Sequence, residues 1–140
     1  PEIVTRENIF ALAGRLFLAM IFLAAAFGKI TNFEATTRYM EAHGMVWASF
    51  FCAAAVGLES LGAISLILGY YTRWGAAALA GFVVAVSWIF HLGHEQRIDL
   101  LKNLAILGGL FQVMAFGPGE LSLEGQAKTP DNRTTGTSLL

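Results

Sequence analysis

The chain has 140 residues, of which 56% are hydrophobic and 14% are charged, and its net charge is −1. This composition excludes an ordinary soluble domain, because nine basic and ten acidic side chains cannot solvate the large relative surface of so small a protein. Nucleic-acid-binding proteins carry strongly basic surfaces, so we expect no nucleic-acid partner. The lone cysteine, Cys52, excludes an intramolecular disulfide and a CxxC redox pair.

Four apolar stretches alternate with short polar clusters along the chain. At 1.5 Å per residue in a helix, each is long enough to cross a hydrocarbon layer about 30 Å thick. They cover residues 10–28, 47–69, 74–91 and 100–116. The sequence therefore predicts an all-α protein, an integral membrane four-helix bundle with its membrane domain in residues 1–123. Four crossings place both termini on one side of the membrane. Basic residues favour the cytoplasmic side, and their numbers on the two sides are equal apart from Arg15, which lies nearer the termini, so we expect cytoplasmic termini.

The segment between the first and second spans is too polar to cross the membrane. Phe33, Thr37 and Met40 recur there at helical spacing, with charged residues between them. Asn32 is a suitable start for a helix and Gly44 a suitable end. The pattern favours a short amphipathic helix lying in the membrane interface over a solvated loop.

Small residues predict where the spans pack against one another, because they let two helix backbones approach closely. They include a stripe at four-residue steps in the third span and a glycine pair in the fourth. The predicted packing residues are Gly62, Ala77, Gly81, Ala85, Gly108 and Gly109. Residues 124–140 are polar and rich in turn-forming residues, so we expect a mobile tail there.

A carboxylate, Glu59, falls near the middle of the second span. An ionised carboxylate at that depth costs a few kcal/mol, so it must be protonated, paired with a cation, or turned into the bundle. Arg15 in the first span is the expected partner, because a guanidinium stays protonated and offers a fork of donors. The sequence thus predicts an Arg15–Glu59 pair that holds the first two spans together.

Further polar residues lie in or near the spans and suggest a polar mouth on the bundle. They are Lys29, His91, Lys102, Asn103 and Gln112. Such a mouth would suit chemistry at the membrane interface. The same residues would equally serve only to hold four helices in register.

His91 and His94 are three residues apart, a spacing that can place two metal ligands on one helix face. Gly93 lies between them and is expected to break the helix, and His43 is distant in the sequence. We therefore predict no metal site and interpret these histidines as interfacial polar residues.

The order of several short motifs resembles the DoxX family of small bacterial membrane proteins. The first span has an early arginine, Arg15, and a Gly-Lys pair near its end at Gly28 and Lys29. Gly44 and "GLESLG" follow, and then "LGYYTRWGAAAL", "KNLAILGGL" and "GPGELSLEG". The resemblance covers residues 14–125. The sequence departs from the family pattern at Glu124, where that pattern has aspartate.

The resemblance implies a multi-pass protein of the bacterial inner membrane, related to the membrane subunit of thiosulfate:quinone oxidoreductase. We therefore expect a membrane subunit associated with a quinone-linked oxidoreductase or a respiratory-type complex. It would have no redox cofactor of its own, and a quinone bound at the polar mouth is the candidate cofactor. The expected partners are membrane lipids and other membrane subunits, or a second copy of the chain. The alternatives are a non-catalytic accessory subunit of a larger complex and, third, a small transporter or proton path.

Overall fold

The computed structural model describes residues 4–90 and 97–128, and helices dominate this part of the chain. The helices are α1 (Arg6–Thr31), α2 (Phe33–Ala42), α3 (Ala48–Leu68), α4 (Thr72–Phe90), α5 (Arg97–Phe116) and α6 (Leu123–Lys128). Four of them, α1, α3, α4 and α5, are long and apolar enough to cross a membrane. The predicted four-span, all-α fold is confirmed. The helix α1 extends beyond the apolar stretch at both of its ends, so it includes charged residues of the interface.

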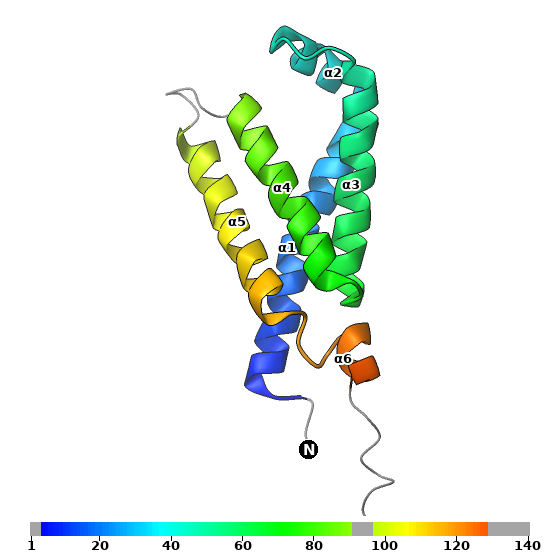
Figure 1. The fold of residues 1–140 in the computed structure, drawn as a ribbon. Helices are drawn as coiled ribbons and strands as arrows, with labels where there is room; N and C mark the ends of the chain where they lie inside the picture. Colours follow the sequence, from blue (N-terminus) through cyan, green and yellow to red (C-terminus); the bar gives the residue numbers. More distant parts are fainter. Residues whose placement is uncertain (1–3, 91–96, 129–140) are drawn as a thin grey trace, which may run out of the picture.

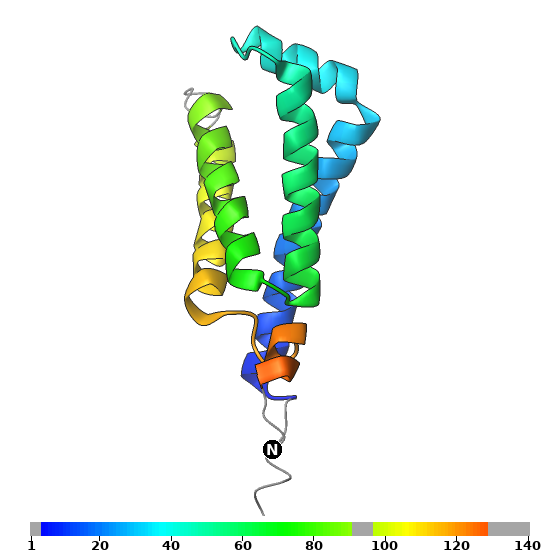
Figure 2. The ribbon, with the colours of Figure 1, turned by 45° about the vertical axis from the view of Figure 1, so that its right-hand side comes forward.

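The four spans form two antiparallel pairs, α1 with α3 and α4 with α5 (Figure 1). The pairs approach each other where α3 turns into α4, and they diverge toward α2, as both views show (Figures 1 and 2). The start of α1 and the helix α6 lie at the same end of the bundle, opposite α2 (Figure 1). The buried core lies between the pairs and is built from Ala19, Phe22, Ala63, Leu66, Ala76, Leu79, Ala80, Val83, Leu110 and Val113.

Two glycines lie where helices approach closely. A Cβ atom on Gly62 of α3 would lie 2.6 Å from Cγ of Leu79 in α4, and one on Gly109 of α5 would lie 3.2 Å from a methyl carbon of Leu18 in α1. A larger side chain at either position would push the helices apart.

The predicted small-residue stripe is not the packing face of α4. Gly81 is exposed, with no atom within 4 Å of a Cβ placed on it, and the same is true of Gly108 in α5. The buried face of α4 instead carries Ala76, Leu79, Ala80 and Val83, while Ala77 is half-buried and Ala85 is exposed. A four-residue period alone does not say which side of a helix meets its neighbour, and here the bulkier residues provide the contact.

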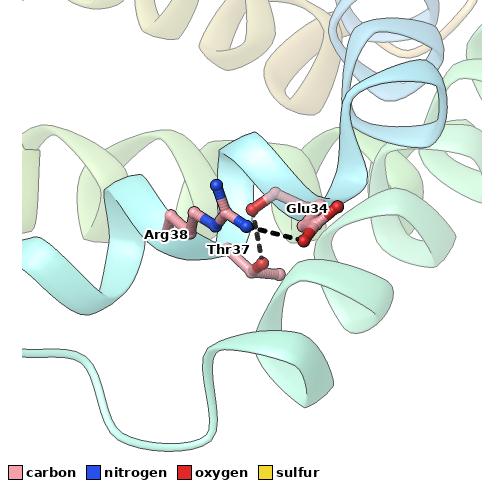
Figure 3. Close-up of polar contacts among 3 residues, drawn as sticks. All are labelled: Glu34, Thr37 and Arg38. Atoms are coloured by element: carbon pink, nitrogen blue, oxygen red, sulfur yellow. Dashed lines mark hydrogen bonds and ion pairs between the residues drawn. The ribbon is translucent and has the colours of Figure 1, made fainter.

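The expected amphipathic helix is α2. It buries Thr37 and Met40, and Met40 packs against Ala48 and Cys52 at the start of α3. Asn32 precedes the helix, but its side chain makes no capping hydrogen bond. On the other face Arg38 donates to the carboxylate of Glu34 over 2.7 Å, and both side chains are exposed (Figure 3).

The segment after α5 folds back across the end of the bundle, where α6 lies beside the turn between α3 and α4 (Figure 1). The backbone N–H of Glu124 donates to the carbonyl of Gly69 over 3.0 Å, and the carboxylate of Glu124 accepts the N–H of Thr72 over 2.9 Å. This second bond satisfies a free N–H in the first turn of α4. Residues 124–128 of the expected tail are therefore helical, within α6, and residues 129–140 lie outside the described part.

Large apolar side chains cover the outer surface of the spans, among them Phe17, Leu61, Trp74 and Phe116. Such an exterior would be costly in water and is suited to lipid. We conclude that the bundle contacts the bilayer directly.

Candidate functional site

A buried ion pair joins the first two spans. The ammonium of Lys29, near the end of α1, lies 2.8 Å from Oε1 of Glu59 in the middle of α3. The Glu59 side chain is 0% exposed and that of Lys29 is 22% exposed. The carboxylate that was expected to need neutralising is thus paired with a cation on the neighbouring helix.

The partner of Glu59 is Lys29, and the prediction that it is Arg15 is wrong. Side chains on a helix lean toward its N-terminus. Because α1 and α3 are antiparallel, the Glu59 side chain leans toward the α2 end, while the Lys29 side chain leans back from that end, so the two converge. The Arg15 side chain leans toward the opposite end of the bundle, away from Glu59.

Arg15 instead ties the C-terminal segment to the end of α3. The side chain is 1% exposed and donates to the carbonyl of Leu66 over 2.7 Å, and it also donates to the carbonyl of Leu121. Leu66 lies in the last turn of α3, where carbonyls lack partners within the helix. The guanidinium therefore has a structural role at the α6 end of the bundle, far from the ion pair.

A cavity of about 660 Å³ borders the ion pair. It lies between the two helix pairs on the α2 side and is lined by residues of α1 to α5. Its lining is mainly apolar and aromatic and includes Phe22, Phe51, Phe82, Val86 and Phe90. The polar lining residues are Lys29, Thr36, Tyr39, Glu59 and Asn103. A mostly apolar cavity with a few convergent polar groups is the usual form of a small-molecule site.

One oxygen of Glu59 lacks a partner. Oε1 accepts from Lys29, but Oε2 is buried and has no hydrogen-bond partner among the described residues. A buried polar atom without a partner is costly, so this oxygen can accept one further hydrogen bond, and Glu59 is among the residues that line the cavity. Lys29 also lies 5.8 Å from the centroid of the Phe82 ring, which helps to hold the ammonium at the cavity.

Asn103 reaches the cavity from α5. Its amide nitrogen donates to Oγ of Ser87 over 3.0 Å, and the Ser87 hydroxyl donates to the carbonyl of Val83 over 2.7 Å. This chain of hydrogen bonds fixes the amide of Asn103 at the cavity wall.

The predicted polar mouth is only partly assembled. Lys29 and Asn103 line the cavity, but Lys102 is 69% exposed and lies 3.9 Å from Asp99 on the outside of α5. Gln112 is exposed and does not line the cavity. His91 lies outside the described residues, as do His94 and Glu95, so the structure does not bear on their interpretation.

Sequence reasoning missed Tyr39 and Phe82, which line the cavity, and Ser87, which holds the amide of Asn103 at the cavity wall. Tyr39 lies one residue from Met40, on the predicted amphipathic helix, and Ser87 is the one polar residue within an apolar run of α4. Ser87 could have been found from the sequence, because a serine at membrane depth needs a hydrogen-bond partner. In residues 4–90 and 97–128 no group of three His, Cys, Asp or Glu side chains is placed to hold a metal ion.

Comparisons with known proteins give one family and two relatives. The sequence profile of the DoxX family matches residues 10–92. The chain is 32% identical over 121 residues to inner membrane protein YqjF of Escherichia coli (strain K12), a match that covers 84% of this chain and 92% of that protein. It is 27% identical over 124 residues to inner membrane protein YphA of the same organism, covering 83% of this chain and 89% of that one. No solved structure matches the chain significantly.

Proposed function

Because the chain belongs to the DoxX family of multi-pass inner-membrane proteins, we propose that it is the membrane subunit of a quinone-linked oxidoreductase. In this proposal the cavity beside Lys29 and Glu59 holds the quinone headgroup. Electrons reach the quinone from a partner subunit.

The observation that carries the proposal is the cavity with its unpartnered carboxylate oxygen. Its volume of about 660 Å³ lies in the range of small-molecule sites, which is about 300–1,000 Å³. Its apolar and aromatic walls suit a planar ring with a hydrocarbon tail, and its few polar groups suit the ring oxygens. The cavity lies between membrane spans, so a lipid-soluble ligand would enter from the bilayer.

The ion pair supplies the two functions that quinone chemistry needs from a protein. A quinone is a carrier of two electrons and two protons. The Lys29 ammonium would donate a hydrogen bond to a ring oxygen and stabilise negative charge that develops there. The Glu59 carboxylate, with one oxygen free, would accept or return a proton at the same ring oxygen.

The proposal is tested by filling the cavity. Ala85 lines the cavity and is exposed, so a phenylalanine in its place would occupy the cavity without disturbing the core. Ala105 is also exposed, but it does not line the cavity, so Ala105→Phe is the matched control. We expect Ala85→Phe to reduce binding of decylubiquinone to the protein in nanodiscs at least tenfold and Ala105→Phe to leave it unchanged. Equal binding by both variants would contradict the proposal.

A second candidate, a non-catalytic accessory subunit, is favoured by a different observation. Gln112 points outward from α5 at membrane depth, one turn after the exposed Gly108. A polar amide facing lipid is unfavourable, and a small residue beside it would let a helix of another subunit approach and bond to it. In this reading Gln112→Leu weakens co-purification of partner subunits while turnover per intact complex is unchanged. Co-purification at the wild-type level would argue against it.

A further inference from the structure

We propose that the cavity selects a ligand presenting a hydroxyl group to the ion pair, so that among quinone carriers it binds the hydroquinone form more tightly than the oxidised form. This inference rests on the proposed function and adds to it the redox form of the ligand. It follows from counting the hydrogen-bond donors and acceptors that Lys29 and Glu59 leave free.

Glu59 contributes a free acceptor. An ionised carboxylate only accepts hydrogen bonds, and the Lys29 ammonium, 2.8 Å from Oε1, favours this ionised form of Glu59. Oε2 has no partner among the described residues. The side chain is 0% exposed but borders the cavity, so a small rotation of the carboxylate brings Oε2 within reach of a ligand in the cavity. The group that completes this site must therefore bring a donor.

Lys29 contributes free donors. An ammonium has three N–H groups, and one of them is used by Glu59. The side chain remains 22% exposed and borders the cavity, so its other N–H groups suit an acceptor in the cavity. The free donors of Lys29 and the free acceptor of Glu59 are thus adjacent, because both belong to one ion pair.

A single hydroxyl oxygen satisfies both groups, since it donates one hydrogen bond and accepts others. The carbonyl oxygen of an oxidised quinone accepts from Lys29 but leaves Oε2 of Glu59 unpaired. Sites built around a ligand hydroxyl discriminate strongly against analogues that lack it, because the polar group of the site is then left buried without a partner. Tyr39 and Asn103 offer both donors and acceptors, so they suit either form. The Thr36 hydroxyl already donates to the carbonyl of Asn32, and Glu59 is the buried group that only a donor completes, so the discrimination falls mainly on Glu59.

The test compares the two redox forms of one ligand. Binding of decylubiquinol and decylubiquinone is measured under anaerobic conditions on the full chain in nanodiscs. For the wild-type protein we expect the quinol to bind about tenfold more tightly, which corresponds to about 1.4 kcal/mol. Glu59→Gln should bring the two affinities close to equal. Glu34→Gln is the matched control, because Glu34 is an exposed carboxylate on α2 outside the cavity, and it should keep the wild-type ratio (Figure 3).

The wild-type ratio tests the inference without any variant having to fold. If the wild-type protein binds the two redox forms equally and Ala85→Phe abolishes the binding of both, the preference for the hydroxyl form is overturned while the proposed function stands. Tighter binding of the oxidised form would also overturn it, because Glu59 would then be acting as a donor. Binding of neither form, or binding that Ala85→Phe does not change, would overturn the proposed function and this inference together.

Discussion

Replacing Lys29 by methionine should destabilise the bundle more than any surface substitution. The change keeps an apolar stem of similar length and removes the cation from Glu59, whose side chain is 0% exposed. At the 2.8 Å separation of Nζ and Oε1, the attraction between the two charges is about 6 kcal/mol at an effective dielectric constant of about 20. Desolvation of both ions offsets part of that attraction. We therefore expect the free energy of unfolding to fall by about 3–5 kcal/mol, as is usual when one partner of a buried pair is removed.

The two partners should not be equivalent. Glu59→Met leaves Lys29 unpaired, but this side chain is 22% exposed and its ammonium can extend toward the interface. We expect a loss of about 1–2 kcal/mol, smaller than for Lys29→Met because the remaining charge is less buried. In the double variant no buried charge remains, and it should recover at least about 2 kcal/mol relative to Lys29→Met.

The assay is equilibrium unfolding in mixed micelles of increasing sodium dodecyl sulfate content, followed by far-UV circular dichroism. Arg38→Met is the matched control, since the Arg38–Glu34 pair of α2 is 74% and 81% exposed (Figure 3). An exposed pair of this kind contributes about 0–1 kcal/mol. A Lys29→Met variant as stable as the control would refute the reasoning. So would a double variant no more stable than Lys29→Met.

Three further predictions concern the α6 end and the helix contacts. Arg15→Met should remove the donor to three carbonyls, those of Leu66, Ile67 and Leu121, and cost about 2–5 kcal/mol, and hydrogen–deuterium exchange of residues 121–126 should rise. If exchange stays at the wild-type rate, Arg15 does not hold this segment. Gly62→Val should cost about 1–3 kcal/mol, because its Cβ would lie 2.6 Å from the buried Leu79, whereas Gly81→Val should be close to neutral; equal unfolding free energies would contradict this. Glu124→Gln removes a charge that accepts from the first turn of α4 and should cost about 0.5–1 kcal/mol, seen as faster exchange of residues 72–75; unchanged exchange would argue against the cap.

The four spans and the interfacial helix were predictable because each depends on local sequence. Hydrocarbon thickness sets the length of an apolar run, and the alternation around Phe33 and Met40 marks a helix with one polar face. Both signals can be read from the sequence without knowing how the helices pack. The ends of α1 were less predictable, since charged residues such as Arg6 continue the helix into the interface.

The partner of Glu59 was not predictable from spacing alone. Sequence periodicity gives the face of a helix on which a residue lies, but pairing also depends on which way the side chain leans and on the level at which two antiparallel helices meet. Lys29 and Arg15 lie on similar faces of α1 and lean the same way along it, so their different levels decide: this lean carries Lys29 toward Glu59 and Arg15 away from it.

The role of residues 117–124 was hidden for a different reason. This short polar segment has no hydrophobic pattern of its own, and it is held by contacts with residues far away in the sequence, notably Arg15 and Gly69. The role of Glu124 is visible only in the structure, where its carboxylate accepts the N–H of Thr72.

The most direct test of the central claim is photoaffinity labelling of the full chain in nanodiscs with an azidoquinone, followed by peptide mapping. We predict that the label falls on residues that line the cavity, such as Phe51, Phe82 and Ile89, and that excess decylubiquinone prevents it. Labelling spread over the lipid-facing surface, at residues such as Phe17 and Phe116, and unaffected by excess quinone, would contradict the claim that this cavity is a quinone site.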